Sequence, residues 1–138
     1  MLEQLRRLTR SVRGVLADSA AEVGLSENDF QALIRVVAAD GLTGAELCRM
    51  LDMTSSSMTE LADRLERAEM IRRTRSEADR RVVLLRPTAR GKRRVERALR
   101  PLLSAVGAVL DSLEGEDLEA VARFLDRIEE GLLTIARR

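Results

Sequence analysis

Two groups of polar side chains near the middle of the 138-residue sequence have types and spacings suited to contacts with phosphate. One group is a run of hydroxyl residues that comprises Thr54, Ser55, Ser56, Ser57 and Thr59. The other is an arginine pair, Arg80 and Arg81, which directly follows Asp79. Small hydroxyls at a helix start bring free backbone N–H groups close to a phosphate, and they can also touch base edges. Arginine carries a planar fork that matches phosphate and guanine.

Each group also has a simpler explanation. Helix capping needs only Thr54, although the three serines that follow are more than a cap requires. The arginine pair can belong to a solvated turn without a partner. We expect Asp79 to hold an arginine by a bidentate pair and so to fix the loop, because a carboxylate is a poor partner for DNA.

The composition argues against catalysis. The chain has no His, Trp or Tyr, and Phe30 and Phe124 are its two aromatic residues. Ser–His and Cys–His nucleophiles, most zinc and haem sites, and base stacking on single strands are therefore excluded. Carboxylates lie beside arginines on expected helix faces, which indicates solvated ion pairs. We expect no catalytic residue, no cofactor and no metal, although a site built from Asp and Glu alone stays an open alternative.

Positive charge is concentrated in one part of the chain. The net charge is +1, but residues 64–100 carry 14 basic and 5 acidic side chains, a net charge of +9. The segments 1–63 and 101–138 each have a net charge of −4. A local excess of this size attracts polyanions over about a Debye length. A solvated basic face is the alternative.

The sequence predicts an intracellular protein. The N-terminal apolar residues are interrupted by arginines, unlike a signal peptide. No segment approaches the roughly 18 apolar residues of a membrane span, so we expect a cytoplasmic location and no membrane partner. Cys48 is the single cysteine. It suits a small buried position, and redox sensing is the less favoured alternative.

Apolar spacing and capping residues predict a series of helices. A stripe from Leu2 to Leu16 indicates a first helix that ends near Gly24. Ser26 and Asp29 resemble a capping box for a second helix, which stops before Gly41. The next two helices begin at capping residues Thr43 and Thr54, and a tight turn at Asp52-Met53 joins them. Glu46 completes a standard capping box with Thr43.

The period then changes to that of strands. Met70–Arg75 and Val82–Leu85 are two expected strands, joined by the polar connector Ser76–Arg81. Pro87 ends the second strand. Thr88 is placed to cap a long helix that runs to about residue 113, and a final helix starts near Glu116.

The first helix and the last two carry apolar stripes at near-heptad spacing. In the final helix the stripe is Leu118, Val121, Leu125, Ile128, Leu132 and Ile135. These helices can pack on their own monomer or on a second copy of the chain. We favour a homodimer, because a slim bundle of this length would otherwise expose a large apolar area.

The predicted fold is mainly α with a small β-hairpin wing. Two helices joined by a tight turn form a helix-turn-helix, whose second helix enters the DNA major groove. The hairpin that follows is a wing, and its arginines suit a narrow minor groove. The candidate contacts with double-stranded DNA are Thr43, Thr54, Ser55, Ser56, Ser57, Thr59, Glu60, Arg64, Arg75, Asp79, Arg80 and Arg81.

Residues 43–91 resemble the winged helix of the MarR family of bacterial transcriptional regulators. The resemblance rests on Leu51-Asp52-Met53-Thr54-Ser55-Ser56-Ser57-Met58-Thr59, on Leu61-Ala62-Asp63-Arg64-Leu65-Glu66, and on Asp79, Arg81, Thr88 and Gly91 in the wing signature. Pro87 stands where the family usually has Leu. The flanking helices match the order of the family across nearly the whole chain.

The resemblance implies one domain over residues 1–138. Residues 25–91 would form the winged helix-turn-helix lobe, and residues 1–24 and 92–138 would be dimerisation helices. It implies an obligate homodimer on a pseudo-palindromic operator. It also implies repression, or occasionally activation, often relieved by a small-molecule effector that binds between the dimerisation helices and the lobe.

Two departures from the family pattern bear on function. Glu60 occupies a recognition-helix position that is often basic or polar; its carboxylate repels phosphate but can accept from cytosine N4. An effector pocket here would be lined by aliphatic side chains, with an arginine to bind an acidic group of the ligand. The sequence does not identify that ligand. Glu60 and the near-neutral total charge also motivate an alternative, a protein-interaction module or antagonist that does not itself read DNA.

Overall fold

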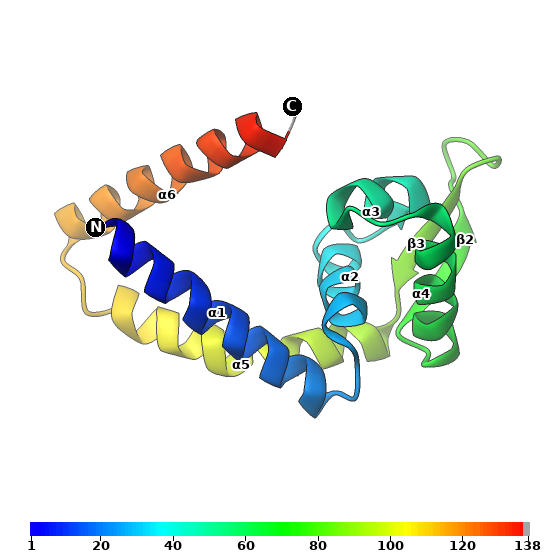
Figure 1. The fold of residues 1–138 in the computed structure, drawn as a ribbon, viewed down its shortest axis with the longest axis horizontal. Helices are drawn as coiled ribbons and strands as arrows, with labels where there is room; N and C mark the ends of the chain where they lie inside the picture. The colour runs from blue at the N-terminus through cyan, green and yellow to red at the C-terminus, as the bar shows by residue number, and fades with distance from the viewer. Residues whose placement is uncertain (137–138) are drawn as a thin grey trace. The chain divides into compact units, whose positions relative to one another are not determined.

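The protein is described by a computed structural model that covers the backbone of residues 1–136. The side chains of residues 133, 135 and 136 lie outside the described part, and with them the predicted role of Ile135. Two compact units make up the chain, and they divide between Arg100 and Pro101 (Figure 1). No helix in the described part of the chain is long and apolar enough to cross a membrane.

Capping residues set the starts of the helices in the first unit. These helices are α1 (Leu2–Glu22), α2 (Glu27–Ala38), α3 (Gly44–Leu51) and α4 (Ser55–Arg67). The hydroxyls of Ser26, Thr43 and Thr54 each accept from the backbone N–H three residues later, as the sequence predicts. Thr43 and Glu46 form the complete capping box. Asp52 ends α3 with a φ of 52°, which turns the chain tightly into α4.

A three-stranded antiparallel sheet replaces the predicted two-stranded hairpin. Its strands are β1 (Leu42–Thr43), β2 (Ile71–Arg75) and β3 (Val83–Pro87), in the order β1-β3-β2. The hairpin of β2 and β3 is confirmed, with Thr74 opposite Leu84. Strand β1 is not expected from the sequence, because two residues before a capping box are too few to show a strand period. Leu42 pairs with Leu85 and so ties α3 to the wing.

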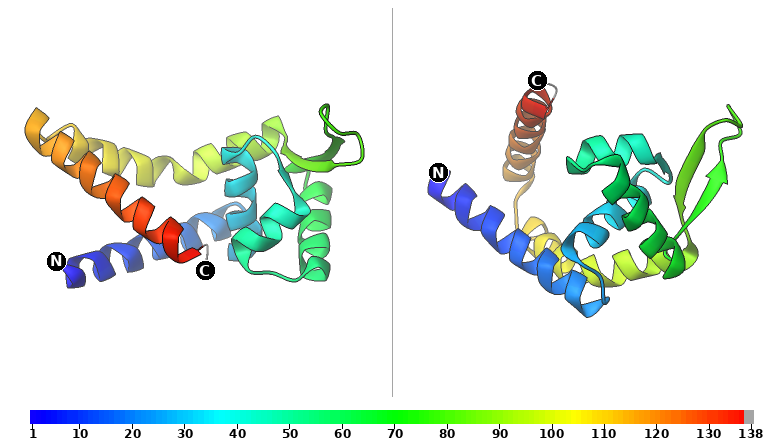
Figure 2. Two further views of the ribbon diagram at one scale, coloured as in Figure 1. Left: turned by 90° about the horizontal axis from the view of Figure 1, so that it is seen from above. Right: turned by 45° about the vertical axis from the view of Figure 1, so that its right-hand side comes forward.

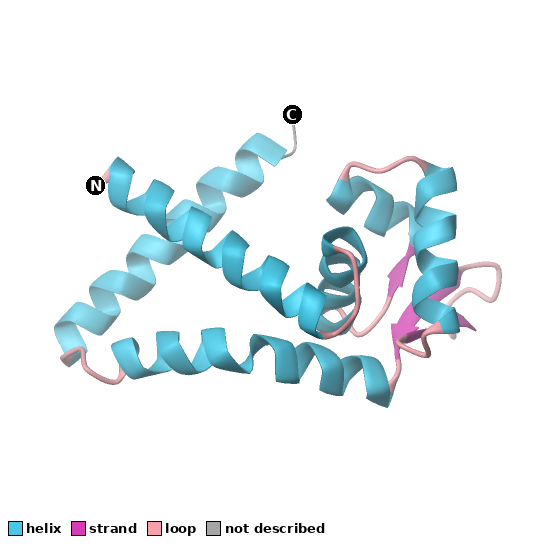
Figure 3. Ribbon diagram, turned by 60° about the horizontal axis from the view of Figure 1, so that its bottom comes forward, coloured by secondary structure: helices cyan, strands magenta, loops and turns pink. Residues whose placement is uncertain are grey.

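The hydrophobic core lies where the helices of the first unit cover the sheet. Its largest fully buried side chains are Phe30, Leu33, Val36, Leu47, Leu61, Leu65 and Ile71. They come from α2, α3, α4 and β2, so one core positions both helices of the helix-turn-helix and the base of the wing (Figure 3). The predicted inward face of α4, with Met58, Leu61, Ala62 and Leu65, is buried as expected.

The terminal helices expose part of the apolar stripes that the sequence predicts. Helix α5 spans Ala89–Leu110, three residues shorter than expected, and α6 spans Gly115–Ala136. Pro101 removes a backbone donor inside α5 at the boundary between the two units. Within the first unit Leu8 of α1 is 60% exposed, and within the second Val109 and Leu125 are 61% and 56% exposed.

Gly91 is the position where the start of α5 meets the sheet. A Cβ on Gly91 would overlap the carbonyl oxygen of Met70 and lie 3.3 Å from Cδ1 of Leu33. The same carbonyl accepts from the backbone N–H and the hydroxyl of Thr88. The glycine of the predicted wing signature therefore allows a close backbone approach between α5 and the residue that leads into β2.

We expect Gly91→Ala to lower the free energy of unfolding by about 1–3 kcal/mol, because the methyl group meets backbone atoms that cannot rotate away. Gly14→Ala is the matched control: Gly14 lies in α1, and a Cβ on it would meet no neighbouring atom within 4 Å. It should raise stability by about 0.5–1 kcal/mol. Urea unfolding measures both, and equal effects of the two substitutions would contradict the close approach.

Candidate nucleic-acid interface

The N-terminus of α4 presents a cluster of exposed hydroxyls. Thr54 accepts from the backbone N–H of Ser57 at 3.3 Å and donates to the Ser57 hydroxyl at 2.9 Å. The hydroxyls of Thr54 and Ser56 lie 3.2 Å apart. All four residues from Thr54 to Ser57 are exposed. The hydroxyl cluster therefore lies at the positive end of the α4 dipole, where a phosphate is attracted.

Thr59 and Glu60 continue this exposed face one turn further along α4. Thr59 donates its hydroxyl hydrogen to the carbonyl oxygen of Ser55 at 2.9 Å, which leaves its oxygen as an acceptor toward solvent. Glu60 is exposed and lies close enough to Arg64 to help raise the pKa of that guanidinium. The two residues offer acceptors to groove donors such as cytosine N4.

A buried carboxylate fixes α4 against α2. Asp29 accepts from Nη2 of Arg64 at 2.7 Å and from Nε at 3.1 Å, a bidentate pair. The Asp29 side chain is 8% exposed and that of Arg64 is 47% exposed. Hydrogen bonding to Asp29 is the main cause that raises the pKa of Arg64.

This pair changes the interpretation of both residues. The predicted capping box at Ser26 is half formed: the Ser26 hydroxyl accepts from the Asp29 backbone at 3.1 Å, but the Asp29 carboxylate turns to Arg64 instead of the cap. The sequence predicts Arg64 as a DNA contact, whereas its fork is occupied within the lobe. A DNA contact by Arg64 stays a prediction, and the role that its geometry shows is to position α4.

A second arginine links α4 to the wing. Arg73 of β2 donates to Asp63 through Nη2 at 2.6 Å, and its other terminal nitrogen contacts Glu66. Its backbone N–H also donates to Glu66 at 3.1 Å. Hydrogen bonding to Asp63 is the main cause that raises the pKa of Arg73. This clamp is not expected from the sequence, because the 10-residue separation crosses from a helix into a strand.

The wing tip is organised by the predicted aspartate. Asp79 accepts from Nε and Nη2 of Arg81 at 3.1 and 3.0 Å, and from the Arg81 backbone N–H at 3.0 Å. The Arg81 side chain is nevertheless 91% exposed. Arg75 donates to the carbonyl oxygen of Arg80 at 3.2 Å and closes the loop. Within the described residues, the Arg80 guanidinium has no ion-pair partner.

Thr43 differs from the candidate contacts on α4 because its hydroxyl takes part in a capping box. Its hydroxyl donates to Glu46 at 2.8 Å and accepts from the Glu46 backbone N–H at 3.2 Å. The capping box thus uses the only hydroxyl hydrogen of Thr43. Hydrogen bonds from Thr43 to the Glu46 carboxylate, with the backbone one first, lower the pKa of Glu46. A DNA contact by Thr43 stays a prediction that would use the remaining acceptor capacity.

The geometry defines a class of protein. Helix α4 follows α3 through a tight turn, and the β2–β3 hairpin follows α4 and projects from the same lobe (Figures 1 and 2). The core, the Asp29–Arg64 pair and the Arg73 clamp hold these three parts together. This arrangement is a winged helix-turn-helix.

Comparison with known proteins finds similarity to one family of transcriptional regulators. Residues 23–82 match the model of the MarR family. The chain is 28% identical over 109 residues to the HTH-type transcriptional regulator YcgE of Bacillus subtilis, covering 79% of this chain and 71% of that protein. It is 27% identical over 127 residues to the HTH-type transcriptional repressor YetL of the same organism, covering 91% and 76%.

The fold of the family is also that of a solved DNA complex. A mutant of Staphylococcus aureus MepR bound to an oligodeoxyribonucleotide superposes with a TM-score of 0.65 and 19% identity, covering 94% of this chain and 96% of that one. The chain is a winged helix-turn-helix protein, and residues 23–82 of it are similar to the MarR family.

We expect Arg64→Gln to lower the free energy of unfolding more than a control on the same helix, because it leaves the Asp29 carboxylate, which is 8% exposed, without its cation. Arg67→Gln is the control on the same helix: Arg67 is exposed and donates to the backbone carbonyl of Asp63. It should change stability by less than about 0.5 kcal/mol. Urea unfolding tests this, and equal losses in the two variants would refute a structural role for the pair.

The geometry of the wing leads us to expect a lowered pKa for Asp79. Side-chain and then backbone hydrogen bonds from Arg81 hold the pKa of Asp79 below its ordinary value of 3.8. The stabilisation of the loop by this pair is complete above the ordinary pKa of Asp79. It is lost as the pH falls through the lower pKa that Asp79 has in the folded protein. A carboxyl-carbon NMR titration from about pH 6 to pH 2 measures the midpoint. Arg81→Gln should move it upward; an unchanged midpoint would show that the pair is absent in solution.

Proposed function

We propose that this chain is a sequence-specific regulator of transcription, most simply a repressor, that binds double-stranded DNA as a homodimer. The observation that carries the proposal is the exposed hydroxyl start of α4 beside a wing whose tip presents Arg80 and Arg81. Both belong to one lobe with a common core. The relatives named as transcriptional regulators support the same conclusion.

The two parts of the interface suit two neighbouring grooves. In this proposal the N-terminal half of α4 enters the major groove, where Ser55, Ser56 and Thr59 reach base edges and Glu60 accepts from cytosine N4. Arg80 and Arg81 enter the adjacent minor groove, whose negative potential is strongest where it is narrow. Because Asp79 holds Arg81 in an exposed position, binding costs less conformational freedom.

The homodimer is supported by apolar surface on the terminal helices. Leu2, Leu8, Leu103, Val109, Leu125 and Leu132 are each at least 56% exposed in the single chain. Soluble monomers rarely leave such stripes uncovered. We propose that residues 1–24 and 92–138 serve as dimerisation helices around the lobe of residues 25–91, and that two lobes bind a pseudo-palindromic operator. The proposal also includes a small-molecule effector of unknown identity that regulates the binding of DNA.

We expect Arg80→Ala/Arg81→Ala to weaken binding to a duplex selected from a random pool by about tenfold or more at about 150 mM salt. The slope of log K against log salt should become shallower by about one unit for each phosphate that the arginines no longer neutralise. Gel retardation over a salt series measures both. The wing arginines project into solvent, so the fold should be unaffected.

Arg6→Ala/Arg10→Ala removes the same charge from α1, where both arginines pair with Glu3. It should leave the affinity within about twofold. If the wing variant binds as tightly as the wild type, the proposed interface is refuted. If the wild type retains no duplex from the pool, the proposed function is replaced by the alternative that Glu60 motivates. In that alternative the chain is a protein-interaction module that does not read DNA.

A further inference from the structure

The basic segment predicted from the sequence is spread over several elements of the structure, and a large part of it lies on α5. Of the 14 basic side chains in residues 64–100, six lie on α5: Arg90, Lys92, Arg93, Arg94, Arg97 and Arg100. In Figure 1 and in the right view of Figure 2 the first half of α5 lies at the bottom of the lobe and the wing tip at the top. The proposed DNA interface therefore does not include the α5 arginines.

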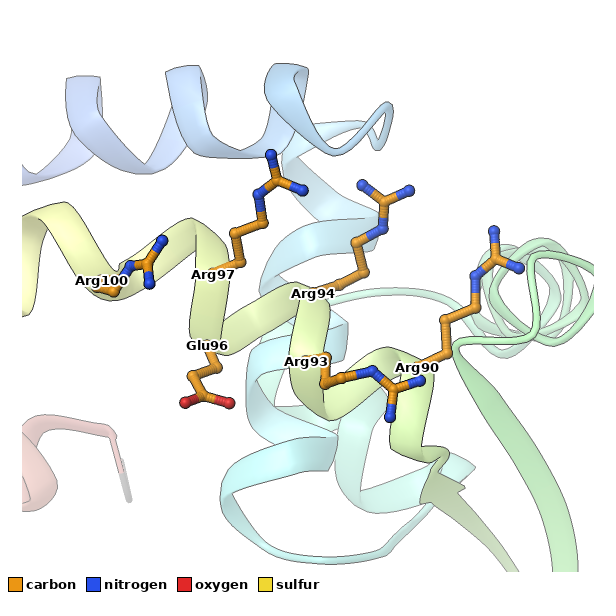
Figure 4. Close-up of a pocket in the computed structure, with 6 residues that line it drawn as sticks. All are labelled: Arg90, Arg93, Arg94, Glu96, Arg97 and Arg100. Atoms are coloured by element: carbon orange, nitrogen blue, oxygen red, sulfur yellow. The ribbon is translucent and has the colours of Figure 1, made fainter.

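These arginines line a groove of about 450 Å3 on the surface of α5, together with Glu96. We call Arg90, Arg93, Arg94, Arg97 and Arg100 the arginine face. The guanidinium groups of Arg90, Arg94 and Arg97 extend to the same side of the helix, and Glu96 points away from them (Figure 4). Among the described residues, Arg90 is the only member of the face with an ion-pair partner, Glu69 at 2.9 Å.

The arginine face is electrostatically unfavourable in the free protein. Its members stand three and four residues apart on one helix, and like charges at this spacing destabilise a helix. The first turn of α5 carries no acidic residue, so the positive end of the helix dipole adds to the same potential. A bound polyanion would relieve both repulsions, whereas a cation or a neutral ligand would relieve neither.

The dimensions of the face favour a small ligand with several anionic groups. Arg90 and Arg97 are separated by about 10 Å along the helix axis, at about 1.5 Å per residue, which is more than one phosphate spans. The groove volume falls in the range of small-molecule sites. We infer that the arginine face binds a small polyphosphate, free or carried by a nucleotide-like molecule, through forked arginine–phosphate pairs.

The contact of Arg90 connects this site to the recognition helix. Glu69 follows the end of α4 with a φ of 56° and leads into β2. The carbonyl oxygen of Glu69 also accepts from the hydroxyl of Thr88, at the cap of α5. A polyphosphate that draws Arg90 from Glu69 would loosen the link between α4 and α5. This consequence for DNA binding rests on the proposed function; the binding site itself does not.

Isothermal titration calorimetry of the full chain with sodium tripolyphosphate, at about 150 mM salt, tests the site. We expect saturable binding that Arg94→Gln/Arg97→Gln weakens by at least about tenfold, since two arginine forks are removed. Arg6→Gln/Arg10→Gln, which removes equal charge from α1, should weaken it less than about twofold. Circular dichroism checks that each variant is folded, and Arg93→Gln/Arg100→Gln is the substitute if the first variant is not.

Three outcomes would overturn the inference. The first is the absence of saturable binding, and the second is an equal loss of affinity in the α5 and α1 variants. The third is that an unrelated DNA duplex displaces tripolyphosphate from the wild type but does not bind the α5 variant. The last would make the face a nucleic-acid surface. If a nucleoside triphosphate binds more tightly than tripolyphosphate, the ligand is a polyphosphate carried by a nucleotide-like molecule. If the two bind with equal affinity, the ligand is a free polyphosphate.

The effect on DNA is measured separately. At constant ionic strength, tripolyphosphate should lower the affinity of the wild type for its selected duplex by at least about fivefold, and that of Arg94→Gln/Arg97→Gln much less. Calorimetric binding without this change would refute the link through Arg90. Failure of the wild type to bind any duplex would refute the proposed function and leave the calorimetric result intact.

Discussion

The ion pair between Asp29 and Arg64 is the interaction on which the proposed interface depends. Helix α4 contributes its buried face to the core through aliphatic contacts, which are non-directional. A bidentate pair between a buried carboxylate of α2 and an arginine of α4 fixes one rotation. The Arg73 clamp to Asp63 and Glu66 then sets the wing relative to the same helix.

Local interactions make much of the lobe predictable from the sequence. The starts of α2, α3 and α4 follow from Ser26, Thr43 and Thr54, because a cap depends on residues three apart. The turn at Asp52 and the inward face of α4 follow for the same reason. The Asp79–Arg81 pair in the wing is also predictable, since its residues are near neighbours in the chain.

Interactions between distant parts of the chain are not predictable in this way. Asp29 and Arg64 are 35 residues apart, and the local pattern at Ser26 assigns the carboxylate to a cap that it does not complete. Strand β1 has only two residues, and its pairing with β3 exists only in the folded lobe. The net charge of residues 64–100 likewise gives no sign that six of its basic side chains lie on α5, away from the wing tip.

The central claim is that α4 and the wing of each copy act together on neighbouring grooves of one duplex. Hydroxyl-radical footprinting on a selected duplex tests it most directly. The account predicts two protected half-sites centred about one helical turn apart or a multiple of it, each flanked by a protected minor groove. Protection of a single half-site, or of two half-sites with unprotected flanking minor grooves, would contradict it.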